Sequence, residues 1–209
     1  KNSKDLLVYF NAFNRHLYRY TGFEILKKLL KRSLKDNEIQ GVFHNCCIYN
    51  EYRLCKILLE DERVDPSFND NVAIRHATTN NNPCVVELLL KDSRIDPTVW
   101  NSYLMRVVCR EGYMDIFKLF LNDKRIDPSA AGNVCIRDAA RLGYTEMVFY
   151  LLQDSRVAPD ADNNIAIRYA TEHNHVEIVK LLSEDPRVDT KGALKIAQRN
   201  NHLELIHLL

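Results

Sequence analysis

The side chains of this sequence that are best suited to metal or acid–base chemistry do not combine into a recognisable site. His173 and His175 form a His-x-His pair, but no third ligand stands at a metal-binding spacing. Cys46 and Cys47 are adjacent, and neighbours on a helix point about 100° apart, which is poor geometry for chelation. We therefore predict no metal site.

Catalytic motifs are also missing from the sequence. It has no Gly-rich phosphate loop, no Gly-x-Ser-x-Gly elbow and no His-Glu-x-x-His helix. Aspartates are numerous, but Asp65, Asp96 and Asp127 recur at a fixed interval. One active site needs asymmetry, so a residue present in every repeat is expected to be architectural. We predict a protein that is not an enzyme and has no catalytic residue, cofactor or small-molecule substrate.

Arginine recurs every 31 residues, followed by Val or Ile and usually by Asp-Pro, which is typical of a repeat protein. This first ladder is Arg63, Arg94, Arg125, Arg156 and Arg187. With the Asp two residues on, it is expected to form ion pairs between repeats or to bond loop carbonyls. A second ladder is Arg75, Arg106, Arg137 and Arg168, expected to bridge to loop backbone groups. The alternative is a guanidinium row that binds an acidic partner or nucleic acid.

Each repeat has the apolar pattern of two short helices separated by a polar break. In residues 71–92, Ile74 and Ala77 lie three apart on one predicted helix, and Val85 begins a leucine-rich second one after Pro83. The position before the first helix is expected to supply an N-cap side chain. Its occupants are Asn71, Ser102, Asn133 and Asn164.

These helix pairs resemble the ankyrin repeat. The family's Thr-Pro-Leu-His segment corresponds to residues 72–75, with Arg75 in the histidine position, and its Gly-His-x-Glu-Val-Val segment is echoed at residues 143–148, 174–179 and 201–206. The period is 31 rather than the usual ~33. The resemblance implies an all-α ankyrin-repeat solenoid of stacked antiparallel helix pairs, with short or absent β-hairpin fingers. This short variety is similar to ankyrin proteins of protists and large DNA viruses.

The array is predicted to span residues 36–209, in units of about 36–63, 64–94, 95–125, 126–156, 157–187 and 188–209. Residues 1–35 are predicted to form a divergent, basic, helical capping unit. They hold nine basic and two acidic residues, a net charge of +7, whereas the rest holds 20 and 26, a net charge of −6. The basic segment suggests an alternative function, binding of nucleic acid or an anionic membrane. A solvated helical face, or attraction between neighbouring units, also explains the charge of this segment, and the acidic array argues against an anion-binding role for the arginine ladders.

Composition sets the remaining expectations. Hydrophobic residues at 46% and charged residues at 27% are ordinary for a folded soluble protein. No apolar run approaches the ~20 residues of a membrane span, and no secretory signal is apparent. We expect a monomer in the cytoplasm or the nucleus. Cys46 and Cys55 occupy the repeat positions of Ala77 and Val86, so the cysteines are expected to be reduced and mostly buried, as small hydrophobic residues.

Binding of another protein is the predicted function, because specificity should lie where the repeating frame changes residue. In ankyrin-like stacks the fingers and the first helices line a concave face. Trp100 is the foremost candidate, with packing on Phe68 as the alternative, and Phe149 is assigned to the outer face. The predicted partner-binding residues are Asn69, His76, Trp100, Val107, Arg110, Asp138, Arg141, Tyr169 and Glu172.

Overall fold

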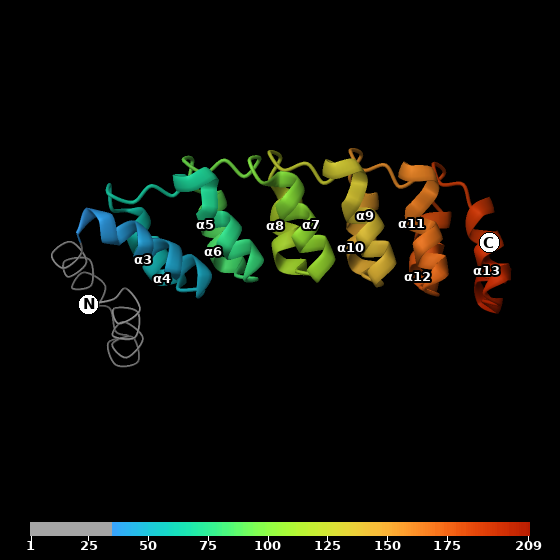
Figure 1. Ribbon diagram of the computed structural model, residues 1–209. Helices are drawn as coiled ribbons and strands as arrows, with labels where there is room; N and C mark the ends of the chain where they lie inside the picture. The colour runs from blue at the N-terminus through green and yellow to red at the C-terminus, as the bar shows by residue number, and fades with distance from the viewer. Residues whose placement is uncertain (1–34) are drawn as a thin grey trace. The chain divides into compact units, whose positions relative to one another are not determined.

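A computed structural model describes residues 35–209, where all of the regular structure is helical (Figure 1). It divides the chain into two compact units, Lys1–Asp96 and Pro97–Leu209. No strand occurs in residues 35–209, so the prediction of an all-α fold with short or absent hairpin fingers is confirmed. The predicted capping unit, residues 1–35, lies outside the described residues except for Lys35.

The first unit contains two helix pairs within its described part. First helices α3 and α5 contact each other, as do second helices α4 and α6. Phe43 and Ile74, on the first helices, are completely buried, as is Leu89 on a second helix. The helices are α3 (Asp36–Ile48), α4 (Tyr52–Leu59), α5 (Phe68–Thr79) and α6 (Pro83–Leu90).

The second unit stacks four helix pairs (Figure 1). Contacts run in succession between first helices α7, α9, α11 and α13, which we call the first-helix layer. Helices α8, α10, α12 and α14 form the second-helix layer. The bounds are α7 (Asn101–Glu111), α8 (Met114–Asn122), α9 (Ala130–Leu142), α10 (Thr145–Leu152), α11 (Ala161–Glu172), α12 (Val176–Ser183), α13 (Lys191–Arg199) and α14 (Leu203–Leu208).

Small residues allow the first helices to pack closely, and branched aliphatic residues fill the space beside them. Ala139 and Ala170 are fully buried on first helices, and Val179 on a second helix. Burial of one aliphatic side chain contributes about 1.5–3 kcal/mol, and stacking adds a second buried face to each pair. All six cysteines are free and five are buried, in agreement with the expected hydrophobic role, whereas Cys84 is exposed.

The first arginine ladder holds the loops between neighbouring repeats. Arg187 donates from Nε and Nη2 to Asp185, at 2.9 and 2.6 Å, and from Nη1 to the carbonyl oxygen of Val157 at 3.0 Å. Arg156 makes the same bonds one repeat earlier. The prediction of bonded loop carbonyls is confirmed, but the expected acid was wrong. The carboxylate partner lies two residues before each arginine, where the short turn brings it alongside the guanidinium.

The aspartates after the arginines have a different role. Asp65 accepts hydrogen bonds from the main-chain N–H and the hydroxyl of Ser67, at 2.9 and 2.6 Å. Asp127 does the same for Ser129, at 2.9 and 2.7 Å. These bonds close the turn after the proline. The aspartates are therefore local turn residues, and the charges of Asp65 and Asp127 also help to raise the pKa of Arg94 and of Arg156 in the next repeat.

The asparagines expected to cap the first helices instead connect one repeat to the next. Asn133 has a φ of 60° and accepts a hydrogen bond from Ala158 N through Oδ1 at 2.8 Å. Asn71 and Asn164 make equivalent bonds, each 2.9 Å long, to Asp96 N and Asp189 N. Each asparagine ends a three-residue left-handed turn, which points its amide toward the following loop. The capping prediction was therefore wrong at these positions; the Ser102 side chain lies outside the described part of the structure.

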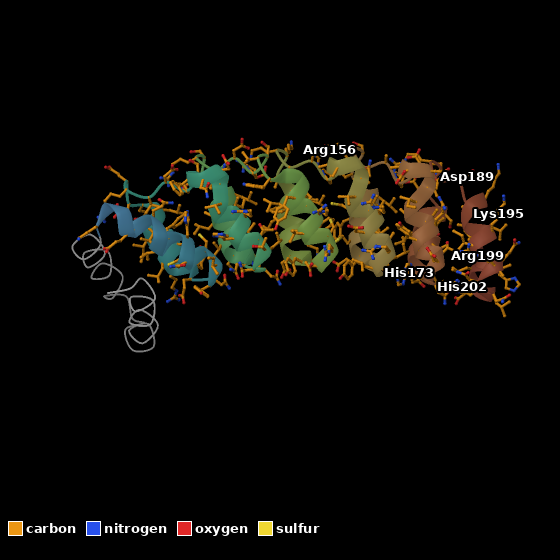
Figure 2. The ribbon with its side chains drawn as sticks, viewed as in Figure 1. Arg156, His173, Asp189, Lys195, Arg199 and His202 are labelled. Carbon is orange, nitrogen blue, oxygen red and sulfur yellow. The ribbon has the colours of Figure 1, made fainter. Side chains whose placement is uncertain are left out.

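A third set of bonds holds the opposite end of the helix pairs. The residue before a second helix contacts a carbonyl oxygen at the end of the first helix of the preceding repeat. His175 Nε2 lies 3.1 Å from Arg141 O, and His202 Nδ1 lies 3.0 Å from Thr171 O. A carbonyl oxygen only accepts, so each ring nitrogen is the donor. Figure 2 shows His173 and His202 at this end and Arg156 and Asp189 at the loop end.

Candidate protein-interaction surface

Six of the predicted binding residues lie in the first-helix layer of the second unit. Arg110 and Glu172 are exposed, and the other four are partly exposed. Because α7, α9 and α11 contact one another in order, the structure brings these residues onto adjoining helices. The pairs, one per helix, are Val107 and Arg110, Asp138 and Arg141, and Tyr169 and Glu172.

Charges within this set interact only loosely. Asp138 Oδ1 lies 3.8 Å from both Arg137 Nε and Arg141 Nη2, and Arg110 Nε lies 3.6 Å from Glu111. These separations exceed the ~2.7–2.9 Å of a charge-assisted hydrogen bond. Partly exposed pairs of this kind contribute little to stability, so their side chains remain available to a ligand.

Trp100 precedes α7 and is only partly exposed. Its ring meets Tyr103 edge-on, with 6.1 Å between ring centroids, and Tyr103 is 39% exposed. Phe68, the neighbour considered from the sequence, has its aromatic contact with His44 at 5.7 Å. Trp100 and Tyr103 thus form an aromatic pair at the start of the first-helix layer.

The two remaining predicted residues, Asn69 and His76, lie in the first unit. Asn69 is exposed, with a φ of 51° in the left-handed turn of α5. His76 lies edge-on to His44, at 6.2 Å between centroids. Burial, reinforced by the charge of Arg75, lowers the pKa of His76, and no described residue bonds its buried Nδ1. The structure therefore divides the nine predicted residues between its two units.

The second arginine ladder does not form the expected backbone bridges at every repeat. Within residues 35–209, neither Arg106 nor Arg168 makes a hydrogen bond to the main chain or an ion pair. Arg168 instead lays its aliphatic stem toward Gly192, with Cδ 3.6 Å from the position of an added β-carbon. That prediction was wrong for these two residues, whose guanidinium groups bond to nothing in the described part of the chain.

The chemistry considered first at sequence level has an architectural explanation. His173 stacks on His175 with 5.9 Å between centroids, and its Nδ1 lies 3.0 Å from Tyr169 O. No cluster of three or more His, Cys, Asp or Glu side chains is placed to hold a metal ion in residues 35–209. In the same residues, every helix is too short or too polar to cross a membrane.

A family model described as ankyrin repeats in three copies matches residues 104–191 and 136–209, together about half of the chain. The chain belongs to the ankyrin-repeat family. No curated protein matches it. Ankyrin repeats are generally modules that bind other proteins, which agrees with the varied residues on the first helices of this ankyrin-repeat protein.

Proposed function

We propose that this ankyrin-repeat protein is a non-catalytic scaffold that binds a protein partner on its first-helix layer, including Trp100 at the start of α7. The proposal rests on one observation: residue types differ between repeats at equivalent surface positions, whereas the residues that hold the repeats together stay the same. Positions 107, 138 and 169, one repeat apart, hold Val, Asp and Tyr, whereas the loop arginines keep both their identity and their bonds.

A rigid frame favours binding because little order has to be gained when the partner arrives. Loop bonds at one end of the pairs and histidine–carbonyl bonds at the other hold α9 and α11 at both ends. Their exposed side chains are thereby presented in a fixed pattern. We place this scaffold in the cytoplasm or nucleus as a monomer; nucleic-acid or membrane binding through residues 1–35 is the alternative prediction.

The test is recovery of partners from a cell lysate on the immobilised chain, followed by substitution. Trp100→Ala and Tyr169→Ala should each release a recovered partner, because aromatic side chains often dominate interface energies. Phe149→Ala is the matched control, since Phe149 is 47% exposed on α10 in the second-helix layer. Retention of every partner by both layer variants, or equal loss with the control, would contradict the proposal.

A further inference from the structure

Charge in the second unit is separated between the two helix layers. The first-helix layer holds eight basic and four acidic residues, a net charge of +4. The second-helix layer holds two basic and four acidic residues, a net charge of −2. Positive charge therefore gathers on the proposed binding layer, although the described chain as a whole is acidic.

Four of these basic residues occupy one equivalent position on successive helices, and we call them the basic row. Arg106, Arg137 and Arg168 are each 31 residues apart, and Lys195 follows after 27. The shorter last interval equals that from His175 to His202, whose rings make equivalent carbonyl bonds. The row therefore crosses all four first helices, and Figure 2 shows Lys195 on the last of them.

Within residues 35–209, the frame does not bond the charged groups of the basic row, although the aliphatic stem of Arg168 lies toward Gly192. Arg156 and Arg187, at the loops, are each occupied by a carboxylate and a carbonyl oxygen. In the described residues, by contrast, Arg106, Arg168 and Lys195 have no acidic partner, and Arg137 has only the distant Asp138 at 3.8 Å. The recurrence of charge at this position is therefore not explained by ion pairs within the described residues.

We infer that the basic row binds an extended, acidic protein segment, with about one carboxylate for each repeat. Packed helices lie ~8–10 Å apart, and an extended segment in the polyproline II conformation advances ~3.1 Å per residue with three residues per turn, so every third side chain points the same way. An Asp or Glu at about every third residue of the segment would therefore meet successive members of the row. This inference rests on the proposed function and specifies the chemistry of its partner.

Acidic residues within the layer favour a peptide over a nucleic acid. Asp138 and Glu172 lie on the same helices as Arg137 and Arg168, and their negative charge disfavours a regular polyanion on this layer. A peptide can place a neutral or basic residue opposite each of these acids. Tyr169, on the same helix as Arg168, adds a partly exposed ring to this layer. Mixed charge of this kind matches a segment with spaced acids.

The experiment uses the full chain and a fluorescein-labelled peptide of about twelve residues, with Glu at every third position and Gly or Ser between. The same peptide with Gln in place of Glu is the ligand control. Fluorescence anisotropy at low and moderate salt gives the affinities. The test variant is R106Q/R137Q/R168Q, and the charge-matched control is K118Q/K124Q/K180Q, whose lysines lie outside the first-helix layer.

The expected result is a loss of at least about tenfold in affinity for the test variant, as three partly exposed ion pairs would contribute. The control variant should stay within about twofold, and the Gln peptide should bind weakly. Circular dichroism with urea unfolding checks that both variants fold. No binding of the Glu peptide, equal affinity in all three proteins, or equal loss in the two variants would overturn the inference.

A labelled single-stranded oligonucleotide is the competing ligand. Binding of the oligonucleotide without the peptide, abolished in the test variant, would also overturn the inference. Failure here is distinct from failure of the proposed function. If Trp100→Ala and Tyr169→Ala still release a captured protein that R106Q/R137Q/R168Q retains, the binding layer stands and only the acidic chemistry of its partner is wrong.

Discussion

Arg156 donates from Nη1 to the carbonyl oxygen of Ile126 at 2.9 Å, thirty residues earlier in the chain. The same guanidinium holds Asp154 through Nε and Nη2, at 2.9 and 2.7 Å. One side chain thus closes its own turn and fixes the preceding loop.

Arg156→Lys should destabilise the protein by about 1–2 kcal/mol, because an ammonium cannot reproduce the planar fork that reaches both partners. Urea unfolding followed by circular dichroism measures the change. Arg106→Lys, in the unbonded basic row, is the matched control and should change stability by less than about 0.5 kcal/mol. Equal effects of the two substitutions would show that the loop bonds have no special weight.

Asn133 combines a left-handed backbone with a hydrogen bond to the next loop, and two substitutions separate these roles. Asn133→Gly keeps the backbone conformation accessible but loses the bond, at a cost of about 1 kcal/mol. Asn133→Ala loses both and should cost roughly 1 kcal/mol more. Unfolding in urea gives both values. Identical stability of the Gly and Ala variants would argue against the left-handed conformation.

Gly143 ends α9 with a φ of 83°, and a β-carbon there would lie 2.9 Å from Cε1 of His175. Gly143→Ala should therefore lower stability by at least about 1–2 kcal/mol, through backbone strain and the ring contact. The double variant Gly143→Ala/His175→Asn relieves the contact only, since Asn is the residue at the equivalent position 82. Its coupling is read from a thermal-unfolding double-mutant cycle; purely additive effects would mean that the ring and the glycine are independent.

His44 and His76 make stability dependent on pH. Burial lowers the pKa of both rings. At His44, the neighbouring His76 lowers the pKa further, and the negative charge of Asp65 partly offsets this shift. A lowered pKa means that the unfolded chain binds more protons, so the stabilisation is complete above about pH 6.5 and is lost as the pH falls through the folded pKa values. Urea midpoints should decline between pH 7.5 and 5.5.

The matched variants for this pH dependence are His76→Gln and His207→Gln. His76→Gln should flatten the decline, because it removes one of the two groups with a lowered pKa. His207→Gln, at an exposed position of α14, should leave it unchanged. A decline of equal slope in wild type and His76→Gln would locate the titration elsewhere.

Sequence periodicity predicted the helix pairs and the carbonyl bonds of the loop arginines. These features recur with the 31-residue repeat, and Arg156 and Arg187 each bond a carbonyl oxygen 30 residues earlier. Periodicity did not predict the role of Asn133. An asparagine that caps a helix and one that bonds the next repeat would recur at the same interval in the sequence. Only the left-handed turn at Asn133 distinguishes the two roles. Arg106 and Arg156 both recur with the repeat in the sequence, but only Arg156 lies where the loop supplies a carboxylate and a carbonyl oxygen, and spacing does not encode that loop geometry.

The sequence indicated the position of one histidine contact but not of another. His175 lies in a segment that matches the family pattern, and its ring contacts Arg141 O, a contact that the pattern alone did not specify. The neighbouring His44 and His76 are 32 residues apart, one more than the period, so no repeat rule paired them. Their contact depends on how two first helices pack side by side.

The frame bonds of the second unit join residues 25 to 34 apart along the chain, from Asn133 with Ala158 to His175 with Arg141. Chain segments therefore meet after closing only short loops, a topology that favours rapid folding. It also permits folding to start at any pair and spread to its neighbours, and unfolding to begin by fraying at an end. During synthesis on the ribosome, each emerging pair can dock on the one before it without waiting for a distant part of the sequence.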